Sequence, residues 1–119
     1  MEQEIAHAAL DLTSGTIGQL SEIPFAVVDF WASWCGPCRR LAPAYEEACA
    51  EVSAKRPGEV RFFKVDVDKE PGLARTYGVM SIPAVIAFSR GKPLERFSGR
   101  PVKEDLVRWV EKLAGNCQG

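Results

Sequence analysis

The sequence has almost no net charge and no long apolar run. Its 15 Lys and Arg residues nearly balance 16 Asp and Glu residues, giving a formal net charge of −1. This balance provides no basic field that would attract nucleic acid or an anionic membrane. The longest apolar run, over residues 23–34, is interrupted by Asp29 and is too short to span a bilayer. We therefore expect neither a nucleic-acid partner nor a membrane partner.

Cysteine is also scarce, since four cysteines among 119 residues are too few for a small domain stabilised by disulfides. The first five residues, Met-Glu-Gln-Glu-Ile, lack the basic and apolar regions of a secretory signal peptide. We therefore expect a reducing, cytoplasmic location. The length and a hydrophobic content of 46% fit one globular domain that spans residues 1–119.

Strand-like and helix-like patterns alternate along the chain, which is typical of an α/β domain. The predicted strands lie within residues 8–12, 25–30, 60–67, 84–89 and 94–98, the last two forming a hairpin around Arg90-Gly91-Lys92. Helices are predicted near 16–20, across 41–52, over 72–77 and across 102–113. We expect Pro43 to kink the second helix and Gly115 to cap the last one.

Cys35 and Cys38 are the only closely spaced cysteines, and they stand where an apolar strand gives way to a helical pattern. A helix N-terminus favours negative charge and can stabilise a thiolate, the reactive form of cysteine. Two cysteines separated by two residues, close to a βαβ pattern, indicate a dithiol/disulfide redox centre. The alternative is a zinc half-site. Zinc would need two further ligands, and Cys49, Cys117 and His7 form no second closely spaced pair, so we expect no metal.

The two other cysteines have different expected roles. Cys49 lies on the apolar face of its helix and is expected to be a small buried hydrophobic residue. Cys117 lies in a polar C-terminal segment and is expected to be an exposed thiol. A regulatory or intermolecular disulfide through Cys117 is the alternative.

The segment from residue 29 to residue 38, Asp-Phe-Trp-Ala-Ser-Trp-Cys-Gly-Pro-Cys, resembles the active-site segment of the thioredoxin family. The family's helix-kinking proline, strand lysine, cis-proline loop and two C-terminal glycines match Pro43, Lys64, Ile82-Pro83, Gly91 and Gly99. The resemblance covers residues 25–113. It implies an α/β thioredoxin fold, in which a mixed central β-sheet is flanked by helices on both faces.

The resemblance also implies a role for each central residue. Cys35, at the exposed start of the helix, would attack a target disulfide, and Cys38 would resolve the mixed disulfide. A carboxylate buried unpaired in an apolar strand is costly, so Asp29 is expected to be protonated, hydrated or paired. The family places the matching aspartate beneath the second cysteine, which implies that Asp29 would accept the proton of Cys38. Lys64 would modulate Asp29, unless it is only a charge at a strand edge. Pro83 would be cis and would face the cysteines.

An apolar substrate-binding rim around Cys35 is implied as well. Its members would be Trp34, Gly36, Pro37, Val67, Ile82 and Gly99. The backbone of Ile82 would pair with an extended substrate segment, as a form of strand addition.

Some positions near this rim depart from the family pattern and leave partner choice open. These positions are Met80, Ser81, Ala84 and Arg100. The rim also has a possible charge preference: Arg39, Arg40 and Arg100 either favour acidic partners or form a solvated charged face.

The function implied by the resemblance is that of a protein-disulfide reductase. Its dithiol would be oxidised by disulfide-containing target proteins and reduced again by thioredoxin reductase, a flavoenzyme. The flavin would belong to that partner, so no cofactor is expected in this chain, which would act as a monomer. The alternatives are a binding module that docks a dedicated partner, and a disulfide oxidase or isomerase.

Overall fold

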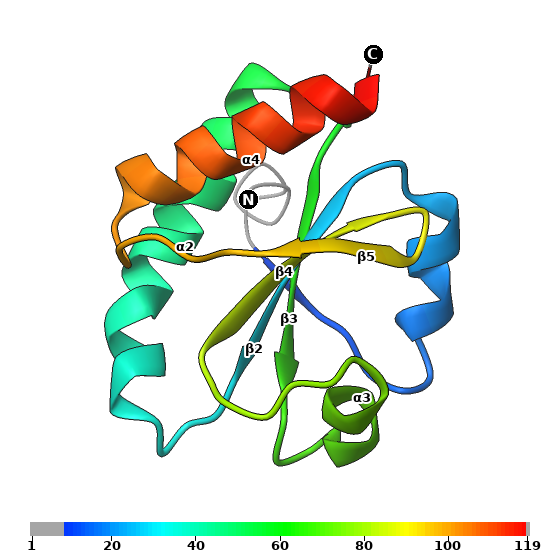
Figure 1. Cartoon of the computed structure of the whole chain (residues 1–119), viewed down its shortest axis with the longest axis vertical. Helices are drawn as coiled ribbons and strands as arrows, with labels where there is room; N and C mark the ends of the chain where they lie inside the picture. The colour runs from blue at the N-terminus through cyan, green and yellow to red at the C-terminus, as the bar shows by residue number, and fades with distance from the viewer. Residues whose placement is uncertain (1–8, 119) are drawn as a thin grey trace, which may run out of the picture.

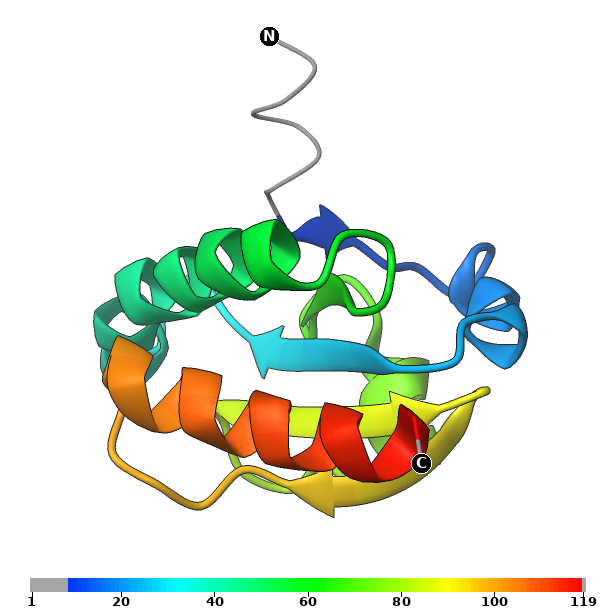
Figure 2. The ribbon, with the colours of Figure 1, turned by 90° about the horizontal axis from the view of Figure 1, so that it is seen from above.

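The computed structural model describes residues 9–118, with only the backbone described at 117 and 118. It contains one five-stranded sheet with the strand order β1-β3-β2-β4-β5. The strands are β1 (Leu10–Asp11), β2 (Ala26–Trp31), β3 (Arg61–Asp66), β4 (Ala84–Ser89) and β5 (Lys92–Arg96). The pairs β1–β3 and β3–β2 are parallel, whereas β4 runs antiparallel to β2 and to β5. The sheet is therefore mixed, with β1 and β5 at its opposite edges (Figure 2).

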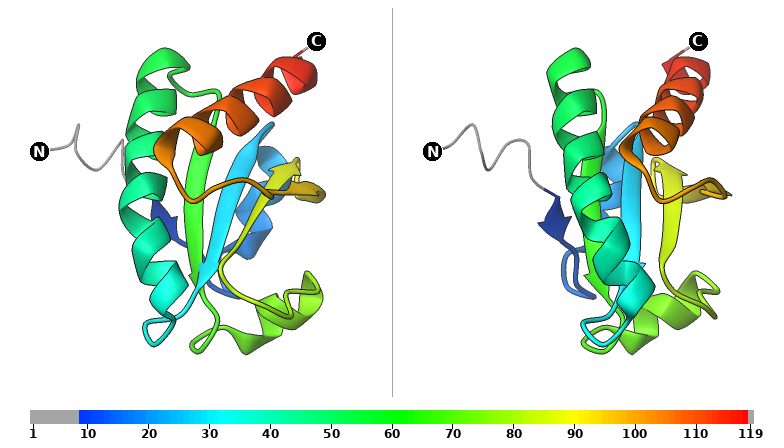
Figure 3. Two further views of the ribbon diagram at one scale, coloured as in Figure 1. Left: turned by 60° about the vertical axis from the view of Figure 1, so that its left-hand side comes forward. Right: turned by 90° about the vertical axis from the view of Figure 1, so that its left-hand side faces the viewer.

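Helices cover both faces of this sheet. They are the 3-10 helix η1 (Ile17–Glu22), α2 (Gly36–Lys55), α3 (Pro71–Thr76) and α4 (Lys103–Gln118) (Figure 1). On one face, α2 and α4 pack together over a core that includes Phe25 and Val27 (Figure 3). On the other face, η1 and α3 close a second core around Phe30 and Phe63. The predicted mixed sheet with helices on both faces is confirmed.

The central strand β2 explains this layering. Its residues from Ala26 to Phe30 are all buried, because neighbouring side chains point to opposite faces and both faces are covered. The one ionisable residue in this run is Asp29. The sheet therefore carries a carboxyl group into the face that lies under α2.

The final helix is longer than predicted, and the expected C-cap at Gly115 is wrong. Helix α4 continues through Gly115 to Gln118. Ala114 is fully buried in the core shared with α2, so tertiary packing holds the last turns despite the low helix propensity of glycine. Cys117 therefore lies in a helix rather than in a tail, while its side chain and the whole of His7 lie outside the described residues.

The β4–β5 hairpin also differs from its predicted bounds. Its turn consists of Arg90 and Gly91, which have φ values of 48° and 86°. Positive φ at both central residues is typical of the tight two-residue turns that match the twist of paired strands. The second strand therefore begins at Lys92, two residues before its predicted start.

Pro43 lies within α2 and does not end it. None of the helices among residues 9–118 has both the length and the apolar character needed to cross a membrane.

Candidate active site

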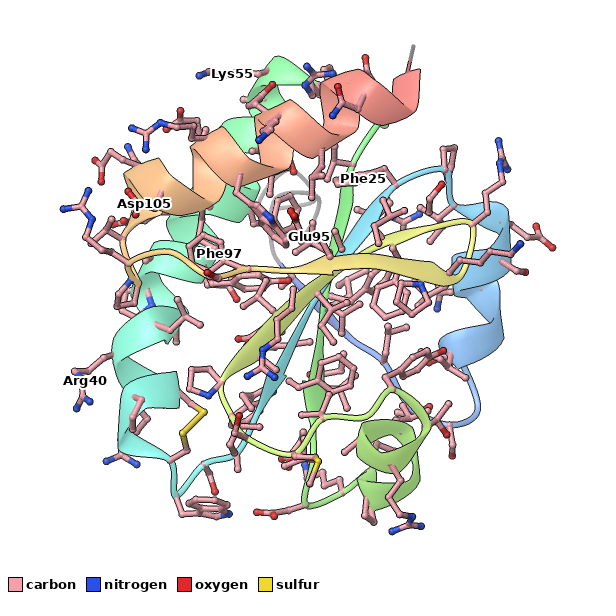
Figure 4. The ribbon with its side chains drawn as sticks, in the orientation of Figure 1. Phe25, Arg40, Lys55, Glu95, Phe97 and Asp105 are labelled. Carbon is pink, nitrogen blue, oxygen red and sulfur yellow. A yellow bond between two sulfur atoms is a disulfide. The ribbon has the colours of Figure 1, made fainter. Side chains whose placement is uncertain are left out.

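The two neighbouring cysteines lie at the junction of β2 and α2 and are joined by a disulfide, with their Cα atoms 5.2 Å apart. Figure 4 shows this yellow sulfur–sulfur bond beside the first turn of α2. Cys35 is the N-cap residue, and its Sγ accepts a hydrogen bond from the backbone N–H of Cys38 at 3.2 Å. Pro37 sits in the first turn, where a missing N–H removes no helical hydrogen bond. Charge on Cys35 Sγ would therefore face both a backbone donor and the positive helix end.

Cys35 is buried, so its expected exposure is wrong. Only 4% of its surface is accessible, and Cys38 is buried with it. Ala32 is buried beside the pair, and the partly buried side chains of Val67 and Ile82 pack against it. The disulfide therefore sits in a small apolar cluster at the surface end of the core.

The loop that carries Pro83 faces this cluster. The Ile82–Pro83 peptide bond is cis, as predicted. The carbonyl oxygen of Ile82 lies 3.9 Å from Cys35 Sγ. The carbonyl group of the residue that precedes Pro83 therefore lies beside Cys35.

A cavity of about 250 Å³ lies on the inner side of Cys38. Asp29 and Lys64 line it together with Trp31 and Glu46. Asp29 is 4% exposed, and burial raises its pKa to about 7, against an opposing effect of Lys64 and a smaller raising effect of Glu46. Within residues 9–118, Asp29 Oδ1 has no hydrogen-bond partner. The cavity therefore holds a carboxyl group that can exchange a proton near neutral pH.

Lys64 belongs to this cavity rather than to an open strand edge. It is the register partner of Asp29 on the neighbouring parallel strand β3. Its Nζ lies 6.0 Å from the centroid of the Trp31 ring, within the range of a cation–π contact. The structure thus brings together Asp29 and Lys64, which are 35 positions apart in the sequence.

Trp34 is the exposed aromatic residue beside the cysteines, with 65% of its surface accessible. Its indole Nε1–H donates to Asp68 Oδ2 at 2.9 Å, and the backbone N–H of Asp68 donates to Asp66 Oδ1 at 2.9 Å. Sequence reasoning missed Asp68, although its position directly after the predicted strand at residues 60–67 was a usable signal. Asp68 fixes the orientation of a ring that would otherwise rotate in solvent.

A second cavity, also of about 250 Å³, is lined by Pro37, Pro83 and Gly99 and by neither cysteine. A Cβ atom at Gly99 would lie 2.7 Å from the Phe97 ring, so the chain approaches too closely there for any other residue without a shift. The predicted rim residues therefore divide between this cavity, the cluster at Val67 and Ile82, and exposed Trp34. Gly36 is half-buried in the first turn of α2.

Two of the residues that depart from the family pattern, Arg100 and Met80, differ in their contacts. Arg100 is bound to the Asp105 carboxylate, with Nη2 3.0 Å from Oδ1 and the backbone N–H 3.0 Å from Oδ2. Its charge is therefore partly balanced within the chain. Met80, in contrast, is 96% exposed next to the Ile82 loop.

Cys49 lies apart from the redox pair. It is buried on the inner face of α2, as predicted, and burial raises the pKa of its thiol to about 11. A thiol with such a pKa is a poor nucleophile at neutral pH. Among the residues that the structure describes, no three His, Cys, Asp or Glu side chains are grouped as a metal site.

A disulfide between two closely spaced cysteines at a helix N-terminus, with a buried carboxyl group beside it, is typical of a dithiol–disulfide oxidoreductase. The thioredoxin family model matches residues 18–112. Thioredoxin of Staphylococcus aureus is 38% identical over 105 residues, which are 88% of this chain and 97% of that protein. The chain belongs to the thioredoxin family, and it is a protein-disulfide oxidoreductase of the thioredoxin type.

Solved structures show the same fold. A mutant thioredoxin from Halobacterium salinarum NRC-1 superposes with a TM-score of 0.75 at 27% identity, over 90% of this chain and 91% of that chain. The zinc-bound form of human ERp44 gives a TM-score of 0.85 at 25% identity. This match covers 88% of the present chain but only 30% of the ERp44 chain.

Proposed function

We propose that the chain reduces disulfides in other proteins through two successive exchanges at Cys35 and Cys38. The Cys35 thiolate attacks one sulfur of the target disulfide, forming a mixed disulfide and releasing the other target sulfur as a thiolate. The Cys38 thiolate then attacks Cys35 Sγ, which forms the Cys35–Cys38 disulfide and releases the second target thiolate. The target gains two electrons and the chain loses two.

Asp29 is the proposed proton acceptor for Cys38 in the second exchange. Both residues line the inner cavity, and the raised pKa of Asp29 lies near neutral pH, where a carboxyl group can accept a proton and release it again. Lys64 is the proposed modulator, because its positive charge favours the ionised carboxylate.

The target segment is proposed to lie along the outer face of the redox pair. Exposed Trp34 and the first turn of α2 at Gly36 would contact it. Further contacts would come from Val67 and Ile82, which pack against the cysteines, and from Pro37 and Gly99, which line one cavity. The backbone of Ile82, held beside Cys35 by cis-Pro83, offers hydrogen-bonding groups to an extended chain.

Thioredoxin reductase, a flavoenzyme, is the proposed electron donor, and disulfide-containing proteins are the proposed targets. The likeness to a thioredoxin over nearly its whole length supports both partners. A cytoplasmic location is proposed because a dithiol persists in a reducing compartment. We further propose that residues 1–119 fold as one monomeric domain.

The observation that carries this function is the position of the cysteines, with Cys35 capping α2 and Cys38 above a buried carboxyl group. The test is the reduction of insulin disulfides by dithiothreitol, with Cys35→Ser and Cys49→Ser as matched variants. We expect strong catalysis that Cys35→Ser abolishes and Cys49→Ser retains. Little catalysis together with stable capture of a partner protein would instead indicate a binding module. An oxidising equilibrium potential against glutathione would indicate an oxidase or isomerase.

A further inference from the structure

The loop between α3 and β4 is held by a side chain from β5. Arg96 Nη2 donates to the backbone carbonyl and to the hydroxyl oxygen of Ser81, both at 3.2 Å, and to the carbonyl of Pro83 at 3.3 Å. Between these two residues lies Ile82, whose own carbonyl is 3.9 Å from Cys35 Sγ. Arg96 thus contacts the loop on both sides of the residue that faces the disulfide.

Strand pairing explains how Arg96 reaches this loop. Strand β5 is antiparallel to β4, and Arg96 lies opposite Ile86, so the end of β5 is beside the start of β4. Residues 79–83 precede β4 and belong to no helix or strand. The carbonyl groups of such a segment need partners outside the regular ladders, and a guanidinium group provides strong, charge-assisted ones.

We propose that Arg96 is a positioning residue for disulfide exchange, which fixes Ser81 and Pro83 so that the Ile82 backbone is presented to the target segment. This inference rests on the proposed function, because that function assigns target docking to Ile82. Ser81, which departs from the family pattern, supplies two of the three acceptors. A loop that is ordered beforehand loses less conformational freedom when the target binds. Arg96 hydrogen-bonds to neither sulfur, so its effect falls on target binding rather than on the exchange step.

The kinetic test compares Arg96→Met with Arg108→Met. Both remove one positive charge from an exposed side chain, but Arg108 lies on α4 and its ion pair is with Asp105. In insulin reduction, we expect Arg96→Met to raise KM about fivefold and to change kcat by less than about twofold. Arg108→Met should match wild type. Arg96→Lys should recover part of the loss, because its ammonium group still donates hydrogen bonds.

Backbone 15N relaxation of Ser81 and Ile82 in the oxidised protein tests the tether without any substrate. Both residues should have lower order parameters in Arg96→Met than in wild type, and Arg108→Met should leave them unchanged. Unchanged order parameters, an unchanged KM or a loss confined to kcat would each overturn the proposal. If wild type itself reduces no insulin, the proposed function fails and the docking role fails with it. The order parameters still show separately whether Arg96 holds the loop.

Discussion

Asp29 and Lys64 lie directly opposite each other on the neighbouring parallel strands β2 and β3, and both line the cavity on the inner side of Cys38. The cavity places a carboxyl group and an ammonium group within one small volume, in which Asp29 is buried and Lys64 is partly exposed. Burial raises the pKa of Asp29 to about 7 even though Lys64 lowers it. Desolvation therefore outweighs the attraction between the two charges.

Because its pKa is raised, Asp29 destabilises the folded protein increasingly as the pH rises. An ordinary Asp, with a pKa of 3.8, loses its proton in the unfolded chain before buried Asp29 does. Between these two values the unfolded state binds fewer protons, so the contribution of Asp29 to stability falls with rising pH and levels off above about pH 7. Asp29→Asn does not titrate. Its advantage over wild type should grow from about pH 4 to about pH 8 by on the order of 4 kcal/mol.

The measurement is denaturant unfolding of both oxidised proteins across that range, read as the difference in the free energy of unfolding. Titration of all other groups cancels in this difference. A difference that stays constant with pH would show that Asp29 has an ordinary pKa.

The same substitution should slow disulfide exchange. Removing a general base typically costs a factor of roughly a hundred to ten thousand in the rate of the step that it assists. In wild type, the rate of release from the mixed disulfide should rise through about pH 7, as Asp29 becomes able to accept a proton. Asp29→Asn should lose this rise, as stopped-flow kinetics would reveal. Equal rates and equal pH profiles for the two proteins would contradict the assignment of Asp29.

Lys64→Met should move the same kinetic transition to higher pH. The positive charge of Lys64 favours the Asp29 carboxylate, so its removal raises the pKa of Asp29 further. Lys69→Met is the matched control, because Lys69 is exposed in the turn that follows β3. A transition that stays in place in Lys64→Met would show that Lys64 has no effect on the carboxyl group.

Asp68→Ala should weaken target binding through Trp34. The indole of Trp34 would lose its 2.9 Å hydrogen bond and gain rotational freedom. The KM for insulin should rise about twofold to fivefold with little change in kcat, since one exposed hydrogen bond contributes about 0.5–1 kcal/mol. Glu104→Ala, which removes an exposed carboxylate at the start of α4, serves as the control. A KM equal to that of wild type would exclude Trp34 orientation as a factor in binding.

The main features of the site are readable from the sequence because they depend on short motifs. The cysteine spacing, the carboxylate in an apolar strand and the Ile82-Pro83 pair are each visible within a few residues. The packing of Cys35 is different, because its burial depends on Val67 and Ile82, which come from two other segments. Local reasoning places a helix N-terminus at the surface and does not detect what folds over it.

Pairs of side chains that meet across loops are also beyond such reasoning. The bonds from Trp34 to Asp68 and from Arg96 to Ser81 join residues 34 and 15 positions apart. Their formation depends on loop conformation and strand register, neither of which has a sequence period. The end of α4 shows a related limit, since buried Ala114 outweighs the helix-ending preference of Gly115.

The outer strand β5 has a consequence for a protein whose proposed targets are extended chains. An open sheet edge can recruit such chains indiscriminately and begin aggregation. Strand β5 presents Pro93, which lacks a backbone donor, among Lys92, Glu95 and Arg96, and its pairing with β4 shifts register between Ala87 and Phe88. At the opposite edge, β1 is only two residues long. Both edges of the sheet are thus poor templates for strand addition. An extended target chain would therefore pair at the proposed docking site beside Cys35, where disulfide exchange can follow.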